Sequence, residues 1–378
     1  MIWLIISELG SEKWDLVPST GCSQYNYYNP QKDDNNSILY TPFTQFYREV
    51  LKGNFVIGAT SLASTGSGSI TISGIPAGST IVKAFLFWAE EDANNASSGN
   101  FNGHPITGIK IAEDCTSCWG TPRNALFYRD VTSYVSGNGT YSLTSFPPLA
   151  CAFGADGLEG VTLIVIYCNP SEIKRTITIY TGDYEQPACN GPSFSWTHTN
   201  FTATNPVVDA KYSISIGNGQ NFGESSAEYV YLNSNLITSD VDGLTGPNGP
   251  CSNGSLWDAF TGSATSWIPA NATSATFSIN NAAGSDCWHP VLSVLSVSSV
   301  DNETYSCVTP VDIEEKLKEP QIKVYNNIVE ISSNYDFKIY SLNGRIIGYY
   351  KSGFYKTKLN KGVYIMIYEN KTKKFIVD

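Results

Sequence analysis

The sequence predicts an all-β protein with two tandem lobes of the β-sandwich or jelly-roll type and a small β-sandwich domain at its C-terminus. Short apolar or alternating runs separated by Gly- and Asn-rich turns predict the strands. An internal repeat predicts the two lobes, and a change in charge near residue 311 predicts the separate C-terminal domain. The expected segments are an irregular N-terminal segment (1–48), a first lobe (49–202), a second lobe (203–307), a linker (308–319) and a C-terminal domain (320–378).

The two lobes are predicted from four sequence matches that occur in the same order in both copies. The offset between matched segments stays between 130 and 136 residues, and chance rarely supplies four such matches. We therefore expect both lobes to share one fold with buried apolar strands. The matched segments are 102–107 with 233–238, 131–135 with 264–268, 140–143 with 276–279, and 161–167 with 291–297.

Strand patterns support this division within each copy. The first copy begins with the alternating run Ser69–Ile72, a Gly-Pro turn at 74–78 and the apolar run Thr80–Trp88. The second copy has comparable runs at 210–216 and 229–232. Packing of the two copies would bury the apolar faces of 80–88 and 161–167.

The C-terminal domain differs from the body in charge. Residues 311–378 hold 12 Lys and Arg against 8 Asp and Glu, whereas the whole chain carries −11, so residues 1–310 carry −15. Seven short strand patterns fit a compact β-sandwich, and Asn343-Gly344 supplies the positive-φ positions of a tight hairpin. The expected strands lie at 322–325, 328–331, 337–340, 346–347, 354–357, 363–368 and 375–377.

Two family resemblances concern the destination of the protein. Asn343-Gly344-Arg345, Lys361-Gly362-Val363-Tyr364 and the terminal Ile376-Val377 make residues 319–378 resemble the C-terminal sorting domain of type IX secretion cargo. That resemblance implies delivery to the cell surface, with the secretion machinery as partner. The body resembles an uncharacterised domain family of bacterial and archaeal surface proteins, which implies fold and location but no chemistry. Its matching segments are 83–88, 101–103, 130–132, 157–167 and 177–182.

The chain has nine cysteines, most of them in loop-like sequence, which indicates disulfides in an oxidising compartment. Cys115 and Cys118 are expected to form a structural disulfide; a zinc site would need a second ligand pair, and a thioredoxin-type site would need a strand-to-helix turn. Cys251–Cys287 is the other expected pair, because both cysteines lie within one repeat. Cys168 ends an apolar run and is expected to be the unpaired, buried thiol.

Candidate catalytic groups are few, and the sequence predicts no enzyme. His104, His198 and His289 are far apart in the chain, and nucleophile-elbow and zinc-protease motifs are absent from the sequence. Glu90-Glu91-Asp92 follows an apolar strand and could supply the paired carboxyl groups of glycoside hydrolysis. Adjacent acids at a strand end usually point apart, so we expect a solvated loop there. No cofactor is expected except calcium, for which Asp240 and Asp242 in an Asp-Val-Asp-Gly turn are the candidate ligands.

The favoured function is a secreted, surface-anchored structural or adhesive protein without catalytic activity. One alternative is a carbohydrate-binding or glycan-acting module that uses Trp119, Trp196 and Trp288 to stack on sugars, although tryptophan is more often buried. Another is a self-assembling filament or lattice subunit, in which an exposed strand edge pairs with a neighbouring copy. Glycans and other surface proteins are the remaining candidate partners. A net charge of −11 argues against nucleic acid. No stretch of the sequence is long and apolar enough to span a membrane.

Overall fold

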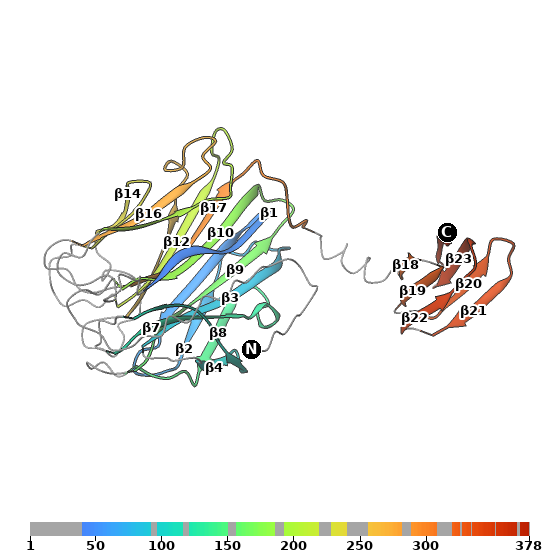
Figure 1. Ribbon diagram of the computed structural model, residues 1–378, viewed down its shortest axis with the longest axis horizontal. Helices are drawn as coiled ribbons and strands as arrows, with labels where there is room; N and C mark the ends of the chain where they lie inside the picture. Colours follow the sequence, from blue (N-terminus) through green and yellow to red (C-terminus); the bar gives the residue numbers. More distant parts are fainter. Residues whose placement is uncertain are drawn as a thin grey trace, which may run out of the picture. The chain divides into compact units, whose positions relative to one another are not determined.

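The computed structural model is nearly all β (Figure 1). Among the described residues, the helical content is one 3₁₀ turn, η1 (Thr132–Tyr134), and no helix is long and apolar enough to cross a bilayer. The chain forms two compact units, Met1–Cys307 and Val308–Asp378, called the body and the tail below. The structure describes residues 40–91, 97–115, 121–149, 156–185, 193–218, 228–239, 256–281, 289–307 and 320–378, the last range without 326, 334, 352, 369, 370 and 378.

A nine-stranded sheet with the order β15-β12-β17-β10-β1-β9-β3-β7-β6 forms the centre of the body. The 21-residue strand β1 connects its two halves, because residues 41–52 pair with β10 and residues 53–61 pair with β9. The strands are β1 (Thr41–Ser61), β3 (Thr80–Glu91), β6 (Ile109–Asp114), β7 (Asn124–Asp130), β9 (Gly157–Cys168), β10 (Lys174–Asp183), β12 (Ala210–Gly217), β15 (Trp257–Ser263) and β17 (His289–Ser298).

A four-stranded sheet packs on each half of the large sheet and completes a lobe. The first has the order β2-β8-β4-β5 and encloses a core with Trp88 and Phe101; the second has the order β11-β16-β13-β14 and encloses a core with Trp196 and Phe277. The strands are β2 (Gly68–Ile72), β4 (Ser98–Phe101), β5 (His104–Thr107), β8 (Gly139–Thr144), β11 (Phe194–His198), β13 (Glu228–Leu232), β14 (Asn235–Thr238) and β16 (Ala275–Asn281).

The two halves of the large sheet also pack against each other and form a third core, the interlobe core. Strand β9 is buried along its whole length, since alternate residues face the first-lobe core and the interlobe core. The indole N–H of Trp257 on β15 donates to Thr162 Oγ1 on β9 at 2.9 Å. Thr162 also hydrogen-bonds Ser215 on β12 at 2.9 Å, so β9 is joined directly to the second lobe.

Matched hydrogen bonds show that the two lobes repeat one fold. Asn102 and Asn233 both adopt positive φ in the hairpin turns β4-β5 and β13-β14. Their backbone N–H groups donate to Ser142 O at 2.7 Å and to Thr276 O at 2.8 Å, on the equivalent strands β8 and β16. The predicted all-β fold of sandwich-like lobes is therefore confirmed.

Two predicted boundaries differ from the structure. Strand β1 begins at Thr41, so the predicted irregular segment 1–48 is wrong for its last eight residues; residues 1–39 lie outside the described part. The predicted division between the lobes at 202/203 does not follow strand pairing. Strands β10 and β11 precede that division but pair with β17 and β16 of the second lobe.

The tail contains all seven predicted strands. They form two sheets, β18-β19-β22 and β21-β20-β23-β24, around a core with Ile339 and Met366. Of the Asn343-Gly344 pair, Gly344 adopts positive φ (84°). The strands are β18 (Gln321–Tyr325), β19 (Ile328–Ser333), β20 (Phe337–Ser341), β21 (Ile346–Tyr350), β22 (Gly353–Lys358), β23 (Gly362–Tyr368) and β24 (Lys371–Val377).

A disulfide between Cys168 and Cys307 corrects the prediction that Cys168 is unpaired. The two Cα atoms lie 5.5 Å apart although 139 residues separate them in sequence. Cys307 packs against the interlobe core, and its Sγ lies 2.8 Å from Lys52 O. The bond therefore fastens the last described residue of the body to the end of β9.

Candidate functional site: a buried acidic cluster between the lobes

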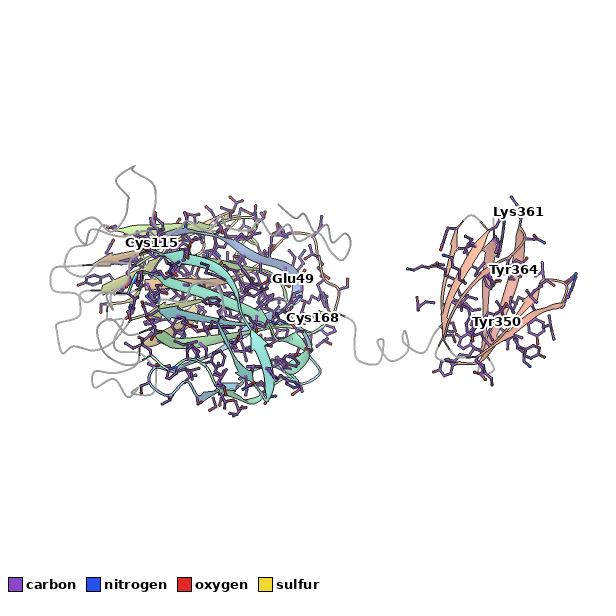
Figure 2. All side chains as sticks on the ribbon, turned by 60° about the horizontal axis from the view of Figure 1, so that its bottom comes forward. Glu49, Cys115, Cys168, Tyr350, Lys361 and Tyr364 are labelled. Atoms are coloured by element: carbon purple, nitrogen blue, oxygen red, sulfur yellow. A yellow bond between two sulfur atoms is a disulfide. The ribbon has the colours of Figure 1, made fainter. Side chains whose placement is uncertain are left out.

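Polar side chains from six chain segments meet at one end of the interlobe core. In antiparallel sheets, the start of one strand lies beside the end of its neighbour, so residues distant in sequence can share one end. Figure 2 shows Cys115, which follows β6, at the end of the body opposite Cys168. The side chains named here as the interlobe cluster are Glu91 at the end of β3, Asn124 at the start of β7, Glu159 in β9, Glu185 after β10, Asn218 after β12 and His289 at the start of β17.

The cluster is sealed from solvent. Glu91, Asn124, Glu159, Asn218 and His289 are 0% exposed, and Glu185 is 3% exposed. Burial of charged groups is costly unless they are paired, hydrogen-bonded or neutralised by protonation. The protonation states therefore decide what this arrangement can do.

His289 lies at the centre of the cluster. Its Nδ1 lies 3.1 Å from Asn124 Nδ2 and 3.2 Å from Asn218 Nδ2, and its Nε2 lies 3.2 Å from the same Asn124 amide, so the ring contacts amide groups of both lobes. The same nitrogen lies 3.3 Å from Glu185 Oε2, and Nε2 lies 3.5 Å from Glu159 Oε2. Burial lowers the pKa of His289 to about 4, so the imidazole is neutral.

Glu159 and Glu91 lie together but in opposite environments. Burial, followed by repulsion from Glu91 and Glu185 and a hydrogen bond with Glu91, raises the pKa of Glu159 well above its ordinary value. Glu91 instead receives two donors: Thr121 Oγ1 to Oε2 at 2.6 Å and Asn124 Nδ2 to Oε1 at 3.0 Å. These donors favour the charged form of the Glu91 carboxyl group, whereas the raised pKa of Glu159 favours its protonated form.

A second group of acids adjoins the cluster. Asp183 at the end of β10 is fully buried, and neither carboxyl oxygen has a hydrogen-bond partner among the described residues. Burial, and then repulsion from Asp114, Glu185, Glu91 and Glu113, raises its pKa well above the ordinary value. Glu113 contacts two cations, Lys110 at 2.6 Å and Arg123 at 3.7 Å. Asp114 accepts the Glu185 backbone N–H at 2.7 Å.

Glycine at position 217 makes room for the cluster. A Cβ there would overlap Glu159 Oε2 and His289 Nε2. The backbone N–H of the next residue, Asn218, donates to Glu159 Oε2 at 3.2 Å. The close approach of β12 to the two titratable groups therefore depends on the missing side chain.

The expectation of a solvated Glu90-Glu91-Asp92 loop is wrong for the two glutamates. Glu90 and Glu91 are the last residues of β3 and are 8% and 0% exposed. The strand extends past Trp88 because Ala89, Glu90 and Glu91 continue the pairing with β7. Their side chains do point apart, as expected of neighbours on a strand. Asp92 lies outside the described residues.

The three histidines do not form one site. His104 on β5 stacks on Tyr134 with ring centroids 4.0 Å apart. His198 on β11 is buried in the second lobe, where Thr178 Oγ1 and Ser293 Oγ hydrogen-bond its two ring nitrogens, each at 2.8 Å. Burial lowers the pKa of His198 to about 3. Only His289 contacts the interlobe cluster.

Several predicted site residues lie outside the described part of the chain: the calcium candidates Asp240 and Asp242, the cysteines Cys118, Cys251 and Cys287, and the tryptophans Trp119 and Trp288. Cys115 is described and is disulfide-bonded. Trp196 is 5% exposed and its indole N–H donates to Ser293 Oγ at 2.8 Å, so it is a core residue and no sugar platform. Within the described ranges, no group of three or more His, Cys, Asp or Glu side chains is arranged to hold a metal ion.

The motif residues of the tail lie at turns and on one core strand. Asn343, Gly344 and Arg345 connect β20 to β21. Lys361 is exposed immediately before β23, while Gly362 and Val363 open that strand. Tyr364 packs on Phe375 with ring centroids 5.5 Å apart, and its hydroxyl donates to Asn360 O at 2.8 Å. Tyr364 therefore stabilises the tail fold, whereas Asn343, Arg345 and Lys361 are exposed.

The fold and cluster define a two-lobed β-sandwich protein whose repeated lobes share one buried acidic centre. A family model matches residues 27–298, so the chain belongs to the family DUF3344, described as a protein of unknown function. The family model therefore spans both lobes of the body.

Solved structures show only distant likeness. A family 86 glycoside hydrolase in complex with neoagarooctaose is 13% identical with a TM-score of 0.25, and the match covers 67% of this chain and 35% of that one. A β-porphyranase of the same glycoside hydrolase family, from Bacteroides plebeius, is 13% identical over 72% and 37%, with a TM-score of 0.24. PNGase F, a glycosylasparaginase from Flavobacterium meningosepticum, is 12% identical over 71% and 98%, with a TM-score of 0.22.

This chain thus spans about a third of the length of the two glycoside hydrolases. Identities and TM-scores this low assign no activity to it. No curated protein matches the sequence.

Proposed function

We propose that this chain is an exported surface protein whose body is a structural or adhesive module and whose tail is a type IX sorting domain. The observation that carries the proposal is the sealed junction between the lobes. In the described part of the body, the strongest concentration of acid–base groups lies in that junction at 0–3% exposure, where it joins the lobes. Side chains buried to this degree suit a structural junction better than an active site, because a bulky substrate could not reach them.

The disulfide and the tail support export. Cys168–Cys307 joins residues 139 apart, and persistent disulfides of this kind are typical of oxidising compartments. The tail forms its own core, separate from that of the body, and its seven strands lie where the sequence predicts them. A self-contained terminal module suits a role as an address that a secretion apparatus recognises.

Export can be tested in a bacterium with a type IX system by producing the whole chain behind a signal peptide and fractionating the cells. We expect surface or medium localisation for the wild type and periplasmic retention when residues 308–378 are deleted. Lys361→Ala is expected to reduce export, while Lys351→Ala, which removes another exposed lysine of the tail, is the matched control. Export unchanged by the deletion would refute the sorting role.

A glycan-acting role is the second candidate, favoured by the contrast between Glu159 and Glu91. One carboxyl group that keeps its proton beside one that is held charged is the combination that acid–base hydrolysis requires. We would measure binding on a glycan array and release of reducing ends from polysaccharides. Hydrolysis that Glu159→Gln abolishes would establish this role, whereas no binding and no hydrolysis would remove it.

A further inference from the structure

We propose that the interlobe cluster is a proton-dependent clasp, which holds the two lobes together while Glu159 is protonated and loosens the interlobe core when Glu159 ionises. The clasp is independent of the adhesive and glycan-acting roles, because it concerns the coupling of the lobes and no external ligand. It gives the ionisable side chains of the cluster a conformational role, because uncharged side chains at these positions would be enough for a stable fold.

The contacts of the cluster cross the lobe boundary in both directions. Asn218 of the second lobe donates its backbone N–H to Glu159 of the first lobe at 3.2 Å. Asn124 of the first lobe donates to His289 of the second lobe at 3.1 Å. Glu159 and His289 face each other at 3.5 Å. Separation of the lobes at this end therefore breaks all three contacts together.

The groups that face Glu159 make a charge there unfavourable. Glu91 approaches from β3 and Glu185 from the end of β10, and both raise the pKa of Glu159. His289 approaches from β17 as a neutral ring, and β7 and β12 present the neutral amides of Asn124 and Asn218. Lys110 and Arg123, two cations at this end, contact Glu113. Ionised Glu159 would meet two carboxylates in a site without water contact.

The expected pH dependence follows from the direction of each shift. Because the pKa of Glu159 is raised in the closed state, its stabilising effect is present at acidic pH and is lost as pH rises through that pKa. His289 acts in the opposite sense. Its pKa is about 4 in the closed state and about 6.5 when the ring is exposed, so acidification below about 6.5 favours the open state, in which the ring is protonated. The clasp should therefore hold best at mildly acidic to neutral pH and loosen on both sides.

Hydrogen exchange of the whole chain, corrected for the intrinsic pH dependence of exchange, tests the clasp. Above about pH 6.5, where His289 no longer contributes, and up to the raised pKa of Glu159, linkage of one proton predicts that protection of amides in β9 and β15 falls about tenfold per pH unit. Amides in β8 and β16, in the outer sheets, should keep their protection. In Glu159→Gln, which retains a hydrogen-bonding group but cannot ionise, the alkaline fall in β9 and β15 should be smaller by about one decade per unit.

Glu172→Gln, near the start of β10 and away from the cluster, is the matched control and should behave as the wild type. An unchanged alkaline fall in Glu159→Gln, or an equal fall in β8 and β16, would overturn the clasp. If Glu159→Gln does not fold, infrared spectroscopy of the double variant Glu90→Gln/Asp183→Asn decides, because the other two buried acids with raised pKa values are then removed. A protonated-carboxyl band must remain at neutral pH in that variant and disappear as protection is lost. If Glu159→Gln loses glycan hydrolysis but its hydrogen exchange keeps the pH dependence of the wild type, the result would support a catalytic role for Glu159 and refute the clasp.

Discussion

Replacement of Glu90 by glutamine should stabilise the body selectively at alkaline pH. Glu90 is 8% exposed near the end of β3, and its Oε2 has no hydrogen-bond partner among the described residues. Burial raises its pKa to about 7; a hydrogen bond from Ser97 lowers the pKa in part, and repulsion from Asp156 raises it further. In the unfolded chain the same carboxyl group has an ordinary value near 4.5. Folding therefore favours the protonated form, and stability is lost as pH rises from about 4.5 through about 7.

The magnitude follows from the linkage relation. At about 1.4 kcal/mol per pKa unit, a shift of about 2.5 units corresponds to about 3.4 kcal/mol in full. Part of that loss has already occurred at pH 5, so the change between pH 5 and pH 9 is about 2.5 kcal/mol. Glutamine has nearly the same shape and does not titrate. The free energy of unfolding of Glu90→Gln relative to wild type should therefore rise by about 2.5 kcal/mol between these two pH values.

Tryptophan fluorescence during urea unfolding is the appropriate assay. All 8 tryptophans lie within residues 1–307, so the signal reports the body and not the tail. Glu303→Gln, at an exposed position, is the control, and its effect should be the same at pH 5 and pH 9 within about 0.5 kcal/mol. A Glu90→Gln effect that does not change with pH would refute the reasoning from burial.

Three further predictions concern other parts of the molecule. Gly217→Ala should cost about 1–3 kcal/mol because its Cβ would overlap Glu159 and His289; tryptophan-detected unfolding would show this, and Gly139→Ala, with open space around it, should be nearly neutral. Cys307→Ser should destabilise the oxidised body by about 2–4 kcal/mol by removing the disulfide to Cys168; equal urea midpoints for the two oxidised proteins would contradict this. Met366→Ala, at a fully buried tail position, should cost the tail about 2–5 kcal/mol; hydrogen exchange in β23 should rise while the tryptophan transition of the body stays unchanged.

Local sequence patterns were sufficient to predict the strands of the tail and the repeat of the body. Alternation along β18 and β20, and turn residues such as Gly344, act within a few residues, so they can be recognised without the tertiary structure. The repeat was detectable because equivalent positions make equivalent contacts. In the first lobe, Ala84 N donates to Thr132 Oγ1 at 2.9 Å, and in the second lobe its counterpart Ala210 N donates to Thr265 Oγ1 at 3.0 Å.

Long-range pairings could not be predicted from those patterns. The disulfide of Cys168 depends on where residue 307 returns to the body, 139 residues later. The interlobe cluster depends in the same way on contacts between Glu159 and residues near positions 91, 218 and 289. One signal was present in the sequence: Glu159 lies beside the apolar run 161–167, in a strand buried on both faces. A charge in such a strand must be buried, whichever face it occupies.

The two buried histidines differ in their contacts, and these contacts, more than burial, indicate that the interlobe cluster couples the two lobes. Both rings are 0% exposed and both have lowered pKa values. Among the described residues, the two ring nitrogens of His198 hydrogen-bond the hydroxyl groups of Thr178 and Ser293 in its own lobe, so a change in its protonation would act within that lobe. His289 faces a carboxyl group and an amide from the other lobe, at 3.5 Å and 3.1 Å. A change of proton occupancy at His289 or Glu159 would therefore act on the interface between the lobes.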